Sequence, residues 1–149
     1  MKNCIVIFII LLNSLAVYSQ SAYKKVYKYG EYNDNWAMVK TISGTYGFIN
    51  REGQEVVPAI YAKIYKFGEY GVDFALVRSI SGIFGLINKE GKEVVPTIYA
   101  KIEKFDAVIS GAAIVKSIAG NYGAINREGK EIILTIYKRD EVVQRSKTL

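Results

Sequence analysis

The sequence predicts an all-β fold in which tandem antiparallel β-hairpin repeats stack as an open array. Three observations lead to this prediction. A unit of 38 residues runs three times without a gap, and turn-forming residues recur at the same two places in every copy. The composition is rich in Tyr, Ile, Val and Phe, which fit a pleated surface, whereas no segment shows a helical hydrophobic period of useful length.

The three copies occupy residues 20–133, and each is identical to the next at 20 of 38 positions. Agreement at this level indicates internal duplication, which is the sequence signature of a repeat architecture. We therefore expect a repeat domain at 20–137 and a charged C-terminal tail at 138–149. Within the repeat domain the copies are 20–57, 58–95 and 96–133, with a partial copy at 134–137.

Two turn signals punctuate each copy. An Asn-x-x-Gly tetrapeptide, first at Asn50–Gly53, fits a type I turn closed by a left-handed glycine. A second signal, first at Ser43-Gly44, contains a small residue followed by glycine. Between these turns the sequence predicts strands at 36–40, 46–50, 55–57 and 63–67.

Glycine and proline have positional meaning inside these strands. Gly47 and its copies Gly85 and Gly123 lie within a strand, where glycine weakens pairing, so their recurrence predicts a close approach of another backbone or a facing ring. Pro58 and Pro96 lack the N–H that a ladder needs, and they are predicted to mark a strand end or edge. One valine and one isoleucine per copy are predicted to be core: Val39, Val77, Val115, Ile49, Ile87 and Ile125.

Residues 1–19 have the features of a cleavable signal peptide. Lys2 gives the positive start, Cys4–Leu12 is apolar, and Val17 and Ser19 suit the −3 and −1 positions of a cleavage site. The apolar run is shorter than the roughly 20 residues of a spanning helix, and its cysteine lies at the start of the run, not after it as in a lipoprotein. We expect a secreted or periplasmic protein with no transmembrane segment and no cysteine after cleavage.

Three repeats can close into a ring or remain open. A propeller needs four or more blades, whereas a β-trefoil closes with three units and is the alternative to the open array. The third copy departs from the others, since Gly68-Glu69-Tyr70 becomes Asp106-Ala107-Val108. Terminal repeats of an open array are expected to be atypical because they lack one neighbour, and this favours the open arrangement.

The segment Tyr46-Gly47-Phe48-Ile49-Asn50-Arg51-Glu52-Gly53, followed by Glu55-Val56-Val57-Pro58 and Tyr61, resembles the WG-repeat family. Its copy from Phe84-Gly85 to Pro96 and Tyr99 does too. The family's tryptophan is replaced by Tyr46, Phe84 and Tyr122, and Leu134 stands where proline is expected. The resemblance implies tandem antiparallel β-units and a binding or scaffolding role, and it carries over no catalytic residue.

The sequence predicts no catalytic residue, no cofactor and no metal site. It has no histidine, and its one cysteine leaves with the signal peptide, which excludes cysteine nucleophiles, histidine-assisted serine chemistry and typical zinc sites. Glu52 and Glu55 recur in every copy, whereas an active site needs a unique place. Asn33-Asp34-Asn35 is not followed by the bidentate glutamate of a calcium loop, and a plain turn is expected there.

Basic residues recur in three sets, interleaved with tyrosine. The sets are Lys25, Lys63 and Lys101; Lys28, Lys66 and Lys104; and Lys40, Arg78 and Lys116. Surfaces that combine cations and aromatic rings can bind anionic glycans or nucleic acid, although lysine also protects exposed sheet edges from unwanted pairing. The candidate partner-binding surface is Tyr27, Lys28, Tyr65, Lys66 and Lys104.

These observations lead to three functional hypotheses. The first is a secreted or periplasmic, non-enzymatic binding module that recognises a protein or an envelope polysaccharide, such as an anionic glycan. Nucleic acid is not an expected partner because the protein is exported. The second is a structural spacer, or an accessory part of an envelope assembly, with no soluble ligand. The third is a weak glycan-active enzyme, which would need a carboxylate that is not repeated.

Overall fold

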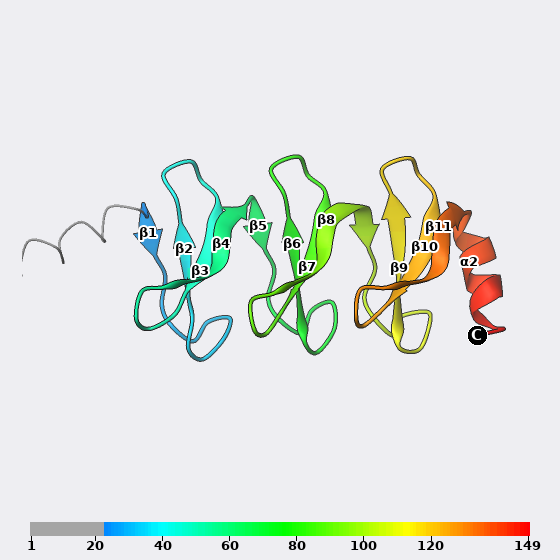
Figure 1. Ribbon diagram of the computed structural model, residues 1–149, viewed down its shortest axis with the longest axis horizontal. Helices are drawn as coiled ribbons and strands as arrows, with labels where there is room; N and C mark the ends of the chain where they lie inside the picture. Colours follow the sequence, from blue (N-terminus) through cyan, green and yellow to red (C-terminus); the bar gives the residue numbers. More distant parts are fainter. Residues whose placement is uncertain (1–22) are drawn as a thin grey trace, which may run out of the picture.

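The computed structural model describes residues 23–149 and confirms the all-β open array. Figure 1 shows three similar units that follow one another along the long axis, with a short helix at the C-terminal end. Neither sheet closes on itself within the described residues, so the trefoil-like alternative is wrong. The predicted signal peptide at 1–19 lies outside the described residues.

The first unit is a four-stranded antiparallel sheet with its strands in sequence order. The strands are β1 (Lys25–Val26), β2 (Ala37–Lys40), β3 (Tyr46–Ile49) and β4 (Glu55–Tyr61). The turn from β2 to β3 lies on the upper edge of the array in Figure 1, and the turn from β3 to β4 lies on the lower edge.

The second and third units share one seven-stranded sheet, ordered from β11 to β5. The strands are β5 (Lys63–Ile64), β6 (Phe74–Arg78), β7 (Phe84–Asn88), β8 (Glu93–Ile102), β9 (Ala112–Ser117), β10 (Tyr122–Asn126) and β11 (Glu131–Tyr137). β8 belongs to both units, because Val95 and Tyr99 pair with β7 whereas Lys101 and Ile102 pair with β9. At the first junction β4 and β5 take these two roles, with Ala62 between them.

Each Asn-x-x-Gly tetrapeptide forms the predicted turn with a left-handed glycine. Asn50 Oδ1 accepts hydrogen bonds from the backbone N–H of Glu52 (3.1 Å) and of Gln54 (2.8 Å), and Gly53 has φ +78°. Asn88 and Asn126 bind the same two N–H groups in their own turns. The asparagine side chain therefore sets the geometry of all three turns.

A bulge lies opposite each strand glycine. Phe48 pairs with Val57 but Tyr46 pairs with Tyr61, so three residues of β4 face Gly47 alone. A Cβ on Gly47 would lie 2.5 Å from the carbonyl oxygen of Val57, which confirms the predicted close approach of backbone.

The prolines do not end their strands, but the predicted edge position is confirmed for Pro58, because β4 is an edge strand of the four-stranded sheet. β4 continues through Pro58 to Tyr61, and β8 continues through Pro96 to Ile102. Both prolines fall at register shifts of their ladders. Because the bulge removes these residues from the regular ladder, the missing N–H costs no ladder hydrogen bond.

The core lies between the units, which stack face against face. Met38, Phe48 and Val57 of the first unit pack with Val77 and Ile87 of the second. The second unit packs on the third in the same way, through Leu86, Val95, Tyr99, Ala113, Val115 and Ile125. The predicted core residues are confirmed as buried: Val39, Val77, Val115, Ile49, Ile87 and Ile125.

The C-terminal face of the third unit is covered by α2 (Arg139–Ser146). Val142 is fully buried in a cluster with Ile114, Ala124 and Ile133. The sequence does not predict this helix, because eight residues with only two apolar side chains are too short to show a helical period. In the described part of the chain, no helix is both long and apolar enough to cross a membrane.

Candidate binding site between the first two units

One row of side chains crosses all four strands of each unit. In the first unit Lys25 pairs with Lys40, Lys40 with Tyr46, and Tyr46 with Tyr61. Residues directly opposite each other in a ladder point to the same face, so two cations and two aromatic rings stand side by side. The second row is Lys63, Arg78, Phe84 and Tyr99, and the third is Lys101, Lys116, Tyr122 and Tyr137.

Each row places two like charges directly opposite one another, which destabilises a sheet. Of the six row cations in the described part of the chain, Lys101 alone forms an ion pair, and its Nζ lies 3.5 Å from Glu103. Four other row ammonium groups lie over rings, and the two closest are those of Lys25 and Lys63. Lys25 Nζ is 4.3 Å from the Tyr27 ring centroid, and Lys63 Nζ is 4.2 Å from that of Tyr65. Cation–π contacts at exposed sites contribute about 0.5–1 kcal/mol, so they offset only part of the repulsion.

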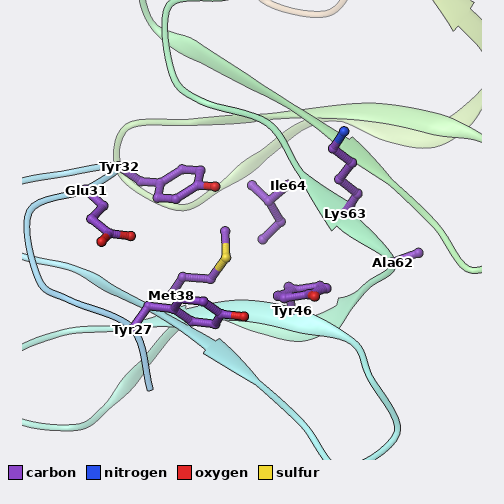
Figure 2. Close-up of a pocket in the computed structure, with 8 residues that line it drawn as sticks. All are labelled: Tyr27, Glu31, Tyr32, Met38, Tyr46, Ala62, Lys63 and Ile64. Carbon is purple, nitrogen blue, oxygen red and sulfur yellow. The ribbon is translucent and has the colours of Figure 1, made fainter. Parts of the chain in front are cut away.

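A pocket of about 370 Å³ opens where the first unit meets the second. Figure 2 shows its lining, with the rings of Tyr27, Tyr32 and Tyr46 around Met38. The remaining lining residues are Glu31, Ala62, Lys63 and Ile64. Glu31 and Lys63 lie at different ends of the lining in Figure 2, so the pocket carries one anionic and one cationic group around an aromatic centre.

A chain of aromatic contacts holds Tyr32 in place. Its ring centroid lies 5.4 Å from that of Phe48, and the Phe48 ring lies 5.5 Å from Trp36. Trp36 in turn meets Phe67 of the second unit at 6.1 Å. Aromatic pairs at these separations attract each other beyond simple burial of area, so the wall of the pocket is a packed element of the core.

The second junction has a different arrangement. Tyr70, the counterpart of Tyr32, packs on Tyr65 with ring centroids 5.9 Å apart. Leu86 replaces Phe48, and Phe84 replaces Tyr46. Without the Phe48 ring to pack against, the Tyr70 ring lies against Tyr65, the counterpart of the pocket residue Tyr27. Equivalent tyrosines therefore pack differently at the two junctions, so the second junction can serve as a control for the first.

Nearby charges act on the phenols around the pocket. A hydrogen bond with Lys40 lowers the pKa of Tyr46 and raises the pKa of Lys40 itself. Burial, and then the carboxylate of Glu31, raises the pKa of Tyr32. Lys40 is therefore firmly cationic, and the Tyr32 hydroxyl stays protonated and able to donate.

The structure brings only part of the predicted surface together. Tyr27 lines the pocket, and Tyr65 lies in the second junction, where it contacts Tyr70. Lys28, Lys66 and Lys104 are exposed in three successive units and do not line this pocket. Because each of them lies two residues after the end of the first strand of its unit, the array spaces them one unit apart.

Sequence reasoning missed most of the pocket. Glu31 and Tyr32 lie in the long loop between β1 and β2, and Met38 and Tyr46 lie on adjacent strands. The alternation of Met38 and Lys40 along β2 was a usable signal, since such residues share one face. The register that places Tyr46 beside Lys40 depends on the turn between their strands, and strand periodicity alone does not specify it.

The Asn33-Asp34-Asn35 segment forms a local turn. Asn33 Oδ1 accepts a hydrogen bond from the backbone N–H of Asn35 at 3.1 Å, and Arg51 donates to the carbonyl oxygen of Asp34 at 3.0 Å. Within residues 23–149 no three acidic side chains gather in a group that could hold a metal ion.

The family model described as "WG containing repeat" matches residues 46–79 and 84–117. Each match begins at the aromatic-glycine dipeptide of β3 or β7 and ends at, or one residue after, the end of the second strand of the next unit. The family's repeat thus spans a junction, with the bulged strand at its centre. No curated protein and no solved structure matches the chain. The chain belongs to the family of proteins with WG-containing repeats.

Proposed function

We propose that the chain is a non-enzymatic binding module that holds a segment of an anionic glycan in the pocket between its first two units. The observation that carries the proposal is the pocket itself, in which three tyrosine rings stand beside Lys63 and Glu31. The expected location, secreted or periplasmic, belongs to this proposal because envelope polysaccharides lie there.

The lining suits a sugar ring. A pyranose presents an apolar C–H face, which packs on aromatic rings, and a rim of hydroxyl groups, which need donors and acceptors. Ligand sites are mostly apolar with a few polar groups that fix orientation. Tyr27, Tyr32 and Tyr46 supply the apolar faces, and Glu31 supplies an acceptor for hydroxyls. The pocket volume of about 370 Å³ fits a short segment of a chain.

The cationic groups favour an acidic sugar. Lys63 lines the pocket, and it faces Arg78 directly across the ladder. The Nε of Arg78 is buried and has no hydrogen-bond partner in the described part of the chain. A carboxylate or sulfate on the glycan would relieve the repulsion between Lys63 and Arg78, so binding and local stability are coupled at this place.

Two competing functions fit these contacts less well. A spacer needs no like charges opposite each other, because alternating charges would stabilise its sheets. A glycosidase uses a pair of carboxylates across the scissile bond, whereas the lining contains Glu31 as its one acidic residue. An acidic protein segment would satisfy the cations, but it would use the aromatic rings less well than a sugar does.

Calorimetric titration with a hexamer of uronic acids, with maltohexaose and with poly-glutamate tests the proposal. The uronate hexamer is expected to bind, with affinity about tenfold weaker for Lys63→Gln, which corresponds to about 1.4 kcal/mol. Lys101→Gln is the matched control at the second junction and should leave the affinity unchanged. Equal affinity for poly-glutamate would indicate a protein partner, and equal effects of the two substitutions would contradict the assignment to this pocket.

A further inference from the structure

We propose that the upper edge of the array docks on the surface of an anionic lipid bilayer. This edge is formed by the turns between β2 and β3, between β6 and β7, and between β9 and β10, and Figure 1 shows all three on the same side. Each turn carries an isoleucine at the same position. Ile42, Ile80 and Ile118 are 78%, 77% and 70% exposed.

A second set of isoleucines lies beside the base of each turn. Ile60, Ile98 and Ile136 are 59%, 50% and 60% exposed. The tyrosine that follows each of them pairs with the first strand residue after the turn, as Tyr61 pairs with Tyr46. Single exposed apolar residues are normal on a protein surface, but two per unit on one edge form a periodic apolar row, which marks an interaction site.

The same edge is cationic. Each turn begins directly after a basic residue, which is Lys40, Arg78 or Lys116. None of the residues in 40–46, 78–84 and 116–122 is acidic. The acidic residues of the lower turns and loops are Glu31, Asp34, Glu52, Glu69, Asp73, Glu90, Asp106 and Glu128. The lower turns and loops carry these acidic residues together with basic ones such as Lys28, Arg51 and Lys89, whereas the upper turns carry basic residues alone.

An anionic bilayer provides both negative charge for the basic residues of this edge and an apolar phase for its isoleucines. Cations near the surface of a leaflet are attracted to acidic headgroups, and apolar side chains at the tips can enter the interface between headgroups and acyl chains. Tyr46, Phe84 and Tyr122 lie directly below the tips, at the level where aromatic rings favour the interface. Each unit therefore presents on this edge a cation, an isoleucine and an aromatic ring, which are the side-chain types that favour the headgroups and the interface of a bilayer.

Two other occupants fit the edge less well. A second copy that paired through the same edge would bring the basic residues Lys40, Arg78 and Lys116 close to the same basic residues of the first copy, and like charges repel. A soluble polysaccharide would satisfy the cations, but it has no apolar phase for the isoleucines. The docking edge borders the proposed glycan pocket, since Tyr46 lines that pocket and Arg78 faces Lys63, but neither the three tip isoleucines nor Lys40 lines it. The isoleucine variant therefore tests the docking without changing the lining of the pocket.

Flotation of the full chain with vesicles tests the docking. Vesicles of phosphatidylcholine with about one-third phosphatidylglycerol should bind the chain at least tenfold more tightly than pure phosphatidylcholine. The combined variant Ile42→Ser, Ile80→Ser and Ile118→Ser should weaken binding to the anionic vesicles at least tenfold. Val72→Ser is the matched control, since Val72 is 69% exposed in the loop between β5 and β6, which Figure 1 shows on the lower edge. This variant should bind like the unsubstituted chain.

A charge-matched pair of variants separates the edge from net charge. The variant Lys40→Gln, Arg78→Gln and Lys116→Gln should lose binding to anionic vesicles, whereas Lys28→Gln, Lys66→Gln and Lys104→Gln should keep most of it. Ile80→Trp should shift its fluorescence to the blue on adding anionic vesicles, and Val72→Trp should not. Equal binding of the upper-edge and lower-edge variants, or equal binding to both vesicle types, would overturn the proposal.

Discussion

Lys63 and Arg78 lie directly opposite each other across the β5–β6 ladder. The first and third units repeat this relationship, with Lys25 opposite Lys40 and Lys101 opposite Lys116. Like charges in directly opposed positions oppose sheet pairing. Each unit therefore holds two cations on one face although their repulsion lowers the stability of the sheet. Such an arrangement is expected of a binding surface.

The first prediction is that removing one of these charges stabilises the protein. Lys63→Gln should raise the free energy of unfolding by about 0.5 kcal/mol, because the repulsion from Arg78 disappears. The gain should shrink in high salt, which screens exposed charges. Urea denaturation at low and high salt measures the effect. A loss of stability at low salt would show that Lys63 is a structural residue.

A second prediction concerns Tyr46. Because hydrogen bonding to Lys40 lowers its pKa, Lys40→Gln should move the pKa of Tyr46 back up toward the ordinary value of about 10. The phenolate loses its neighbouring cation in this variant, which fixes the sign. Titration followed by NMR of the tyrosine ring carbons measures the pKa. An unchanged pKa in Lys40→Gln would contradict the contact, and Lys116→Gln serves as a distant control.

The third prediction concerns the helix that covers the third unit. Arg139 donates two hydrogen bonds to Glu103, at 3.0 and 2.8 Å, and these bonds are the main reason that the pKa of Glu103 is lowered. A lowered folded-state pKa stabilises the fold above the unfolded-state value and ceases to do so as the pH falls through the folded-state value.

Arg139→Gln should therefore cost about 1 kcal/mol at neutral pH, the upper part of the range for a partly exposed ion pair. The cost should shrink as the pH falls through the folded-state pKa of Glu103 and vanish below it, where the carboxyl group is protonated in both states. Thermal denaturation of the two proteins across this pH range measures it. A cost that is independent of pH would show that the ion pair does not contribute.

A fourth prediction tests the bulge. A Cβ on Gly85 would lie 2.4 Å from the carbonyl oxygen of Val95, and backbone cannot move aside easily. Gly85→Ala should destabilise the protein by about 3 kcal/mol through overpacking. Gly82→Ala is the comparison, because its site is open and only its positive φ of +83° opposes a side chain. That change should cost about 1 kcal/mol. Similar costs at both sites would contradict the close approach.

Much of the fold was predictable because local chemistry repeats. The asparagine of each Asn-x-x-Gly turn binds two N–H groups of its own turn, so the turn follows from four residues. The role of Gly47 was predictable as well, since a glycine that recurs inside a strand usually accompanies a bulge or a close approach of backbone. The predicted strand end at Pro58 was wrong because proline is compatible with both a strand end and a bulge. Only the pairing with the partner strand decides between them.

The pocket could not be predicted because it depends on packing between units. Tyr32 and Tyr70 are equivalent in sequence, yet one packs on Phe48 and the other on Tyr65. That difference follows from the exchange of Phe48 for Leu86 on a neighbouring strand. The α2 helix was not predicted for a related reason. Burial of Val142 on the third unit stabilises it, whereas its own sequence shows no helical period.

The proposed glycan site is tested most directly by a heteronuclear NMR titration of the chain with the uronate hexamer. The account predicts that the perturbed signals belong to Tyr27, Tyr32, Met38, Tyr46 and Ile64, around the first junction. The counterparts at the second junction, Tyr65, Tyr70 and Leu76, should stay in place. Perturbation of both junctions alike, or of the lysines on the lower edge alone, would contradict the claim that this pocket binds the glycan.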